Sequence, residues 1–299
     1  MSDAAPIRAG FVAVVGRPNV GKSTLVNALV GRHVAIVSRR PQTTRRRILG
    51  VANRPGAQLV LVDSPGLHGA GGRPLNRALN ASARRAAADA DAVLLVAEAA
   101  AWDEDDARAL AVVRDGGMPV VLALNKIDLL RPRSALLPLL EAASARHDFA
   151  AVVPVAAARG ENIERLASVL TPLLPPSPLL FPPGEITDLG PAERAAEFVR
   201  EALIERLGQE LPYATYVTVG RYAQENSCLD IEATIWVARE SQKGIVIGAG
   251  GRMAKAIGTA ARRRLEAEVG GKVMLRLWVR VRAGWDRDPG ALAELGIGL

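Results

Sequence analysis

The chain has 299 residues, of which 49% are hydrophobic and 23% are charged. This length and hydrophobicity exclude disorder over most of the chain and leave room for about two domains. The single cysteine, Cys228, excludes a disulfide framework and a cysteine-based zinc site, and it indicates a reducing compartment. No apolar run approaches the roughly 18 residues of a spanning helix, and the N-terminus lacks a signal-peptide pattern. We therefore expect a soluble, cytoplasmic protein.

The net charge of +7 is unevenly distributed along the chain. Residues 185–237 contain 10 acidic and 4 basic residues, whereas residues 239–282 contain 11 basic and 3 acidic residues. A basic balance favours a polyanionic partner, and its position matters more than its size. Residues 239–282 are therefore expected to attract a phosphate backbone that residues 185–237 would repel.

The first part of the chain alternates short apolar runs with amphipathic helices. Buried strands are predicted at Phe11–Gly16, Gln58–Asp63, Ala92–Glu98, Val120–Asn125 and Ala151–Ala156. The segments 22–30 and 103–113 have the pattern of helices. Strands that are apolar throughout and alternate with helices are typical of a mostly parallel sheet with helices on both faces. We expect an α/β domain over residues 8–174.

A proline-rich stretch separates this domain from a second one. Residues 172–191 hold 7 prolines in 20 positions, which excludes a continuous helix or a central strand. We predict a stiff, extended linker over residues 175–191 and an α+β domain over residues 192–299. Its elements are predicted in the order α-β-β-α-α-β: helix 192–207, strands 216–222 and 229–237, a segment 245–247 before a glycine loop, helix 253–269 and strand 272–282.

Residues 16–24 have the pattern of a phosphate-binding loop placed between a strand and a helix. They are Gly16, Arg17, Pro18, Asn19, Val20, Gly21, Lys22, Ser23 and Thr24. Backbone N–H groups of such a loop bind the β-phosphate, Lys22 neutralises the β and γ oxygens, and Ser23 offers a hydroxyl to Mg²⁺. The alternative is a flexible glycine turn, which the strand–loop–helix context disfavours.

A second nucleotide motif follows the strand 58–63. It consists of Asp63, Ser64, Pro65, Gly66 and Leu67. Asp63 can hold Mg²⁺, and the Gly66 N–H can bond the γ-phosphate and so detect its loss. Asp-Ser-Pro-Gly is also an ordinary turn. The motif indicates a nucleotide site only because it follows the phosphate-binding loop at the expected spacing.

A third motif, again at the end of a strand, indicates which base is bound. It consists of Asn125, Lys126, Ile127 and Asp128. The Asp128 carboxylate can accept from N1–H and the exocyclic N2 amine of guanine, whereas adenine would leave it unpaired. The stem of Lys126 can cover one face of the base. The alternative interpretation is that Asp128 is a surface residue that caps the N-terminus of a helix.

The glycine loop of the second domain fits an RNA-binding KH domain. The pattern is Gly248, Ala249, Gly250 and Gly251, and the element order matches the type II form. A GxxG loop between helices brings backbone N–H groups close to RNA phosphates. The residues that we expect to contact RNA are these four with Lys243, Ile245, Ile247, Arg252 and Lys255. Val246 would line the same groove.

Several motifs together resemble the Era family, bacterial GTPases of small ribosomal subunit assembly. They are GRPNVGKST, PQTTRRRI, DSPGLH, NKID, the proline-rich linker, ELPY, ESQKGIVIGAGG and GWDRDPGALAELG, and they cover nearly the whole chain. The resemblance implies a P-loop GTPase domain followed by a type II KH domain. It also implies binding and hydrolysis of GTP with Mg²⁺, and binding to the 3′ region of 16S rRNA and to the 30S subunit.

The resemblance also assigns roles to single residues. It implies that Thr44 closes over Mg²⁺ beside Ser23 and Asp63, and that Lys22, Asn19 and Thr44 serve catalysis. Ala156 replaces the usual serine of the guanine-capping loop, where the Ala157 N–H is expected to bond guanine O6. Leu67 stands where many relatives carry a water-orienting glutamine, so we expect slow hydrolysis. Asn19 resembles the asparagine of potassium-stimulated GTPases, which suggests K⁺ as a second cation.

Other interpretations of the chain's function and of several residues stay open at this point. The chain could be an RNA-binding protein whose nucleotide site is mainly structural. Peripheral attachment to the inner face of the cell membrane is a family trait that these residues neither support nor exclude. The arginines of residues 39–47 and of residues 262–264 could contact RNA or lie on a solvated surface. The glutamates at 193, 197, 201 and 205 form a solvated face or pair with basic residues of this chain. Trp236 stacks on a base or is a packed or linker-facing indole. The acidic run 103–106 is expected to suit the start of a helix rather than a metal.

Overall fold

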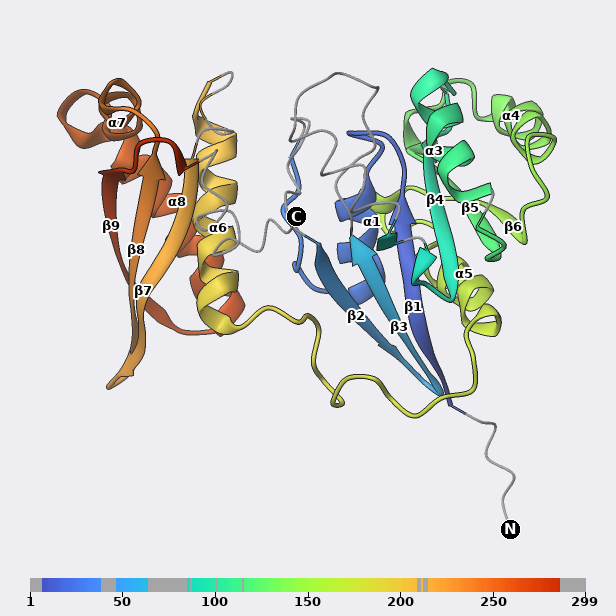
Figure 1. Cartoon of the computed structure of the whole chain (residues 1–299), viewed down its shortest axis with the longest axis horizontal. Coiled ribbons are helices and arrows are strands. Elements are labelled where there is room, and N and C mark those ends of the chain that lie inside the picture. The colour runs from blue at the N-terminus through green and yellow to red at the C-terminus, as the bar shows by residue number, and fades with distance from the viewer. Residues whose placement is uncertain are drawn as a thin grey trace, which may run out of the picture. The chain divides into compact units, whose positions relative to one another are not determined.

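The computed structural model divides into two units, Met1–Asp188 and Leu189–Leu299, which Figure 1 colours from blue to red along the chain. The structure describes residues 7–38, 47–63, 85–86, 88–100, 102–114, 116–208, 211 and 215–285. Within these residues, no helix combines the length and the apolarity that crossing a membrane requires.

The first unit is built on a six-stranded sheet. In spatial order its strands are β2 (Ile48–Arg54), β3 (Ala57–Asp63), β1 (Arg8–Val15), β4 (Ala92–Glu98), β5 (Val120–Asn125) and β6 (Ala151–Pro154). All neighbouring strands are parallel except β2, which runs antiparallel to β3. This arrangement confirms the predicted, mostly parallel sheet. Strand β2 was not predicted, because Gly50 and Asn53 interrupt its apolar run and Pro55-Gly56 closes it into a hairpin.

Helices cover both faces of this sheet, as predicted. Helices α1 (Lys22–Val30) and α5 (Ile163–Leu170) share one core with Val12 and Val14 of β1. Helices α3 (Glu104–Arg114) and α4 (Leu136–Ser144) belong to a second core with Ala13 and Val15, which point to the opposite face. Successive side chains of a strand alternate between faces, so β1 is buried by both layers. Its carboxyl end leads directly into the phosphate-binding loop.

The proline-rich stretch lies against the first unit over much of its length. Pro176 and Thr187 form isolated backbone bridges with Arg8 and Gly50. The fully buried Gln58 side chain accepts hydrogen bonds from the N–H groups of residues 180 and 181, at 2.8 and 2.9 Å. These contacts place the stretch up to Asp188 with the first unit. The limits 8–174, 175–191 and 192–299 stay a proposal, since contact does not decide which segments fold independently.

The second unit has the predicted order α-β-β-α-α-β. Its elements are α6 (Pro191–Arg206), β7 (Thr215–Glu225), β8 (Cys228–Val237), α7 (Glu240–Ile247), α8 (Arg252–Val269) and β9 (Lys272–Val281). The sheet order is β7-β8-β9, with β8 antiparallel to β7 and parallel to β9. One face of the sheet packs on α6 and α8 through residues such as Leu203, Ile235 and Ala261. This is the fold of a type II KH domain.

Candidate functional site

Two positions of the phosphate-binding loop require glycine. A Cβ on Gly16 would lie 2.3 Å from the Val96 carbonyl oxygen, and one on Gly21 would lie 2.3 Å from Nδ2 of Asn125. Gly21 also has a φ of 101°, in the left-handed region, where it precedes α1. The loop is thereby held close to the ends of β4 and β5, because no side chain separates the backbones.

Lys22 is the buried cation of this loop. Its ammonium donates to the carbonyl oxygens of Gly16 and Arg17, at 3.0 and 2.9 Å, and the residue is only 7% exposed. Burial lowers the pKa of Lys22 to about 8, and the nearby Asp63 carboxylate opposes this shift. The lysine is therefore aligned along the loop by backbone carbonyls, in an environment that favours an anionic ligand.

The two predicted metal ligands with described positions lie side by side. The Ser23 hydroxyl donates to Asp63 Oδ2 at 2.8 Å, and Asp63 is fully buried. Among the described residues, no group of three or more His, Cys, Asp or Glu side chains is arranged so that it could hold a metal ion by itself. Mg²⁺ is commonly held by one or two protein oxygens while phosphates and waters complete its shell. The hydroxyl and the carboxylate therefore fit Mg²⁺ bound together with a nucleotide.

Asn125 connects three loops. Its amide donates to the Val20 carbonyl oxygen at 2.8 Å, and its Oδ1 accepts from the Ala157 N–H at 3.0 Å. The residue is 2% exposed, so both bonds lie in the protein interior. Asn125 thus ties the phosphate-binding loop to the guanine-capping loop. It also uses the Ala157 N–H that we expected at guanine O6, so that contact would require a shared hydrogen bond and stays a prediction.

Lys126 and Asp128 each have an ionic partner. Lys126 has a φ of 65°, and its ammonium donates to Glu98 Oε2 at 2.7 Å. Asp128 Oδ2 lies 3.3 Å from Nε of Arg159 in the loop after β6. No sequence pattern predicted Glu98 or Arg159, because each pairs with a residue from another segment of the chain. Both partners position groups that we assign to guanine recognition.

The remaining nucleotide-site residues differ in how far the structure describes them. Asn19 is exposed, and its φ of 64° lies in the left-handed region. Ile127 is buried and anchors its loop in the core. Thr44, Ser64, Pro65, Gly66 and Leu67 lie outside the described residues, as do the arginines at 39, 40, 45 and 46.

The GxxG loop between α7 and α8 also requires glycine. Gly248, Gly250 and Gly251 have φ values of 70°, 59° and 75°. A Cβ on Gly248 would lie 2.7 Å from Cβ of Met253, whereas one on Gly250 or Gly251 would meet nothing within 4 Å. Ala249 and Gly250 are exposed. The loop therefore presents bare backbone that a phosphate can approach closely.

Side chains around this loop divide between surface and core. Ile245 is 56% exposed and Ile247 half-buried, whereas Val246 is fully buried in the core of the unit. Placing Val246 in the RNA groove was wrong, because the segment 245–247 is helical and its three side chains point in different directions. Arg252 and Lys255 are exposed, and Lys243 pairs with Glu240 at 3.1 Å.

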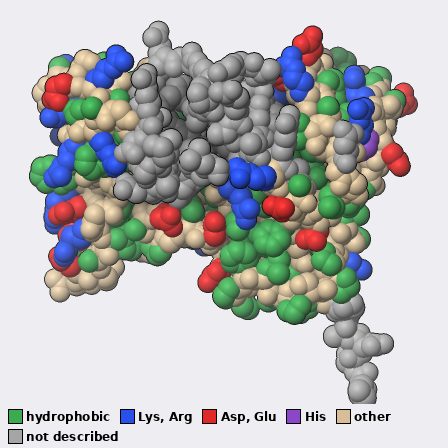
Figure 2. Space-filling model, viewed as in Figure 1, with side chains coloured by type: hydrophobic (Ala, Val, Ile, Leu, Met, Phe, Trp, Pro, Cys, Tyr) green, Lys and Arg blue, Asp and Glu red, His purple; other side chains and the backbone are tan. Residues whose placement is uncertain are grey.

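Much of the remaining charge in this unit is paired internally. Nε of Arg264 lies 3.2 Å from the buried Glu201 of α6, so this part of the glutamate row binds a cation of its own unit. On the sheet, Arg276 pairs with Asp230 at 2.9 Å. Figure 2 shows red and blue side chains interleaved over β8 and β9.

Trp236 stacks on the ring of Tyr216, and its indole N–H donates to the Thr218 hydroxyl at 2.9 Å. These contacts favour an indole that is packed against its own unit.

The fold and the two sites define a P-loop GTPase that carries a KH domain. Residues 11–126 match the family described as 50S ribosome-binding GTPase, and residues 210–286 match the KH domain family. The chain is 52% identical to GTPase Era of Stenotrophomonas maltophilia strain K279a, over 99% of both chains. It is 51% identical, with the same coverage, to GTPase Era of Xanthomonas campestris pv. campestris strain B100. The chain belongs to the Era family of GTPases.

Two solved structures share the whole fold. A variant of Aquifex aeolicus Era bound to GDP and AlF4⁻ is 35% identical, with a TM-score of 0.92 over 98% of this chain and 100% of that one. Era in complex with MgGDPNP and nucleotides 1506–1542 of 16S ribosomal RNA is 35% identical, with a TM-score of 0.91 and the same coverage.

Proposed function

We propose that this GTPase acts in assembly of the small ribosomal subunit, by binding the 3′ region of 16S rRNA and the 30S subunit through its KH domain in a nucleotide-dependent way. The observation that carries the proposal is the presence in one chain of a guanine-nucleotide site and an exposed GxxG loop. The Era structure with MgGDPNP and a 16S rRNA segment supports the choice of RNA, since it matches this chain over 98% of its length.

Hydrolysis of GTP is expected to be slow without a partner. The charges that can stabilise the transferring phosphoryl group are Lys22 and a metal held by Ser23 and Asp63, with Thr44 as a further proposed ligand. Mg²⁺ bound with the nucleotide would supply neutralisation of the phosphate charge. Lys22 is already oriented by two carbonyl oxygens, so little rearrangement is needed there. Multiple turnover with GTP, lost in Lys22→Ala, would exclude the alternative of a purely structural nucleotide site.

A potassium ion near Asn19 is the second cation that we propose. Asn19 is exposed, and a monovalent cation beside it would act like an arginine finger. Turnover in KCl should exceed turnover in NaCl at equal ionic strength, and Asn19→Ala should abolish the difference. Equal rates in the two salts would contradict this assignment.

The RNA partner can be tested without assuming its sequence. The full chain, loaded with a non-hydrolysable GTP analogue, is crosslinked to total RNA and the recovered RNA is sequenced. We expect enrichment of the 3′ region of 16S rRNA relative to the same experiment with GDP. Enrichment of unrelated RNA, or an equal yield from the GDP-bound protein, would contradict the proposal.

Peripheral association with the inner face of the cell membrane stays a prediction from the family resemblance. Co-sedimentation of the full chain with anionic and neutral vesicles tests it directly, and sedimentation with neither would contradict it.

A further inference from the structure

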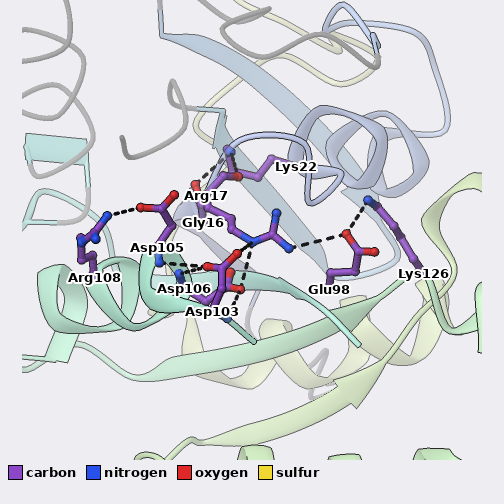
Figure 3. A network of polar contacts seen from close by, with 9 residues as sticks. All are labelled: Gly16, Arg17, Lys22, Glu98, Asp103, Asp105, Asp106, Arg108 and Lys126. Carbon is purple, nitrogen blue, oxygen red and sulfur yellow. Dashed lines mark hydrogen bonds and ion pairs between the residues drawn. The ribbon is translucent and has the colours of Figure 1, made fainter. Parts of the chain in front are cut away.

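The side chain of Arg17 binds carboxylates of the protein, although the residue belongs to the phosphate-binding loop. Its Nε lies 3.0 Å from Asp106 Oδ2 and 3.2 Å from Asp103 Oδ2, and its Nη2 lies 3.6 Å from Glu98 Oε2. Figure 3 shows the guanidinium between these three carboxylates. The side chain is only 16% exposed. This environment suits a guanidinium, whose fork of donors can serve several acceptors at once.

The acidic partners of Arg17 are themselves fixed at the start of α3. Asp103 Oδ1 accepts from the N–H groups of Asp105 and Asp106, at 2.9 and 3.1 Å. Asp106 Oδ2 in turn accepts from the Asp103 N–H at 3.2 Å, and Asp106 is 1% exposed. Reciprocal bonds of this kind hold the first turn of a helix in one conformation. Asp103 and Asp106 therefore form a rigid anchor, and the acidic run has a role beyond the helix dipole.

Glu98 extends this anchor to the guanine side of the site. Its Oε2 accepts from the Lys126 ammonium at 2.7 Å and lies 3.6 Å from the Arg17 guanidinium (Figure 3). Arg17 also supplies one of the two carbonyl oxygens that orient Lys22. One carboxylate at the end of β4 thus lies between the loop that we assign to phosphate and the lysine that we assign to the base.

We propose that Arg17, Glu98, Asp103 and Asp106 form a positioning network that makes recognition of phosphate and recognition of guanine depend on each other. Arg17 is a positioning residue in this network and not a phosphate ligand through its side chain. Loss of Arg17 would leave three carboxylates near one another without their shared cation, so the loop and the Lys126 stem would both shift. The proposal concerns nucleotide binding alone and does not depend on the RNA partner.

The network predicts non-additive effects on GDP affinity in the full chain. We expect Arg17→Ala and Lys126→Ala each to weaken binding of a fluorescent GDP by roughly tenfold, which is about 1.4 kcal/mol. Because both side chains act through Glu98, the double variant should lose several-fold less than the product of the two effects. In a Glu98→Gln background this coupling should disappear. Multiplicative effects in the native background would overturn the proposal, since two independent structural residues would behave in that way.

A neighbouring ion pair provides the matched control. The Asp105 side chain pairs with Arg108 on the exposed side of the same helical turn, and only its backbone N–H bonds a member of the network, Asp103 Oδ1 (Figure 3). Asp106→Asn should weaken GDP binding several-fold while Asp105→Asn leaves it unchanged, and equal effects would overturn the proposal. Melting of the nucleotide-free variants separates lost affinity from lost folding. If Arg17→Ala or Asp106→Asn fails to fold, Arg17→Lys replaces the failed variant in these comparisons. The lysine keeps the positive charge and loses the several donors of the guanidinium.

Discussion

The two units hold their functional groups in opposite ways. In the GTPase unit, Lys22, Asp63 and Asn125 are buried and hydrogen-bonded to other residues of the site. In the KH unit, Ala249 and Gly250 expose bare backbone, and nearby cations such as Lys255 lie on the surface. Fixed, buried donors and acceptors select one small ligand, whereas exposed backbone accepts the phosphates of a flexible polymer. The contrast teaches that the first unit is built to select one small ligand, whereas the second is built to let the phosphates of a polymer come close to its backbone.

Replacing the guanine-reading carboxylate should give the largest effect. In Asp128→Asn the amide nitrogen faces the guanine N1–H and N2 amine with donors of its own, so GDP affinity should fall on the order of 10³-fold. Xanthosine diphosphate has a carbonyl oxygen in place of the amine, so it should bind this variant better than GDP does. Isothermal titration calorimetry with GDP and with xanthosine diphosphate measures whether the variant now prefers the second nucleotide. An unchanged preference for GDP would show that Asp128 does not read the base.

A carboxylate on the GxxG loop should give the next largest effect, on RNA alone. Gly250→Asp places a negative charge where a phosphate must approach, so affinity for a 16S rRNA oligonucleotide should fall roughly tenfold or more. Gly270→Asp is the matched control, because Gly270 has a similar φ of 64°, compared with 59°, and open space around its Cβ. It lies at the far end of α8. An equal loss in both variants would contradict the placement of RNA on the loop.

The lowered pKa of Lys22 predicts a pH dependence of nucleotide affinity. With a pKa of about 8 in the free protein, the lysine loses its proton as the pH rises from about 7 to about 9. Phosphate binds the charged form, so GDP affinity should fall about tenfold over this range. An unfolded lysine keeps its proton up to its ordinary pKa of 10.5. Between the two values the unfolded state binds more protons, so this group makes folding more favourable as the pH rises.

Guanosine provides the control for this titration. It carries the same base and no phosphate, so its affinity should follow the ionisation of guanine alone. Subtracting its pH profile from that of GDP isolates the contribution of Lys22. Identical profiles for guanosine and GDP would contradict the assignment of the titration to this lysine.

The ion pair between Arg159 and Asp128 should give the smallest effect. Arg159 is 62% exposed, and exposed pairs contribute about 0.2–1 kcal/mol. We therefore expect Arg159→Ala to weaken GDP binding by at most about fivefold, because the guanine-reading carboxylate loses one orienting contact. Arg133→Ala is the control, since Arg133 is similarly exposed and pairs with Glu161 at 3.7 Å. A stronger GDP affinity in Arg159→Ala would show that the arginine competes with guanine.

Local sequence patterns predicted most of the strands and the nucleotide and GxxG motifs, but they did not predict β2 or the side-chain contacts of Glu98 and Arg159. The strands β4 and β5 were readable because each is one unbroken apolar run. Glu98 and Arg159 belong to no local motif, because their roles arise only where the ends of β4, β5 and β6 meet. Val246 was misplaced because a groove was read from three consecutive apolar residues that the helix distributes around its axis.

The most direct test is the affinity of the full chain for an RNA of nucleotides 1506–1542 of 16S rRNA, measured with a GTP analogue and with GDP. Coupling between two sites is typically 5- to 150-fold, so the GTP form should bind at least about fivefold more tightly. The same RNA must then raise the ratio of GTP-analogue affinity to GDP affinity by an equal factor. Equal RNA affinity in the two nucleotide states would contradict the account.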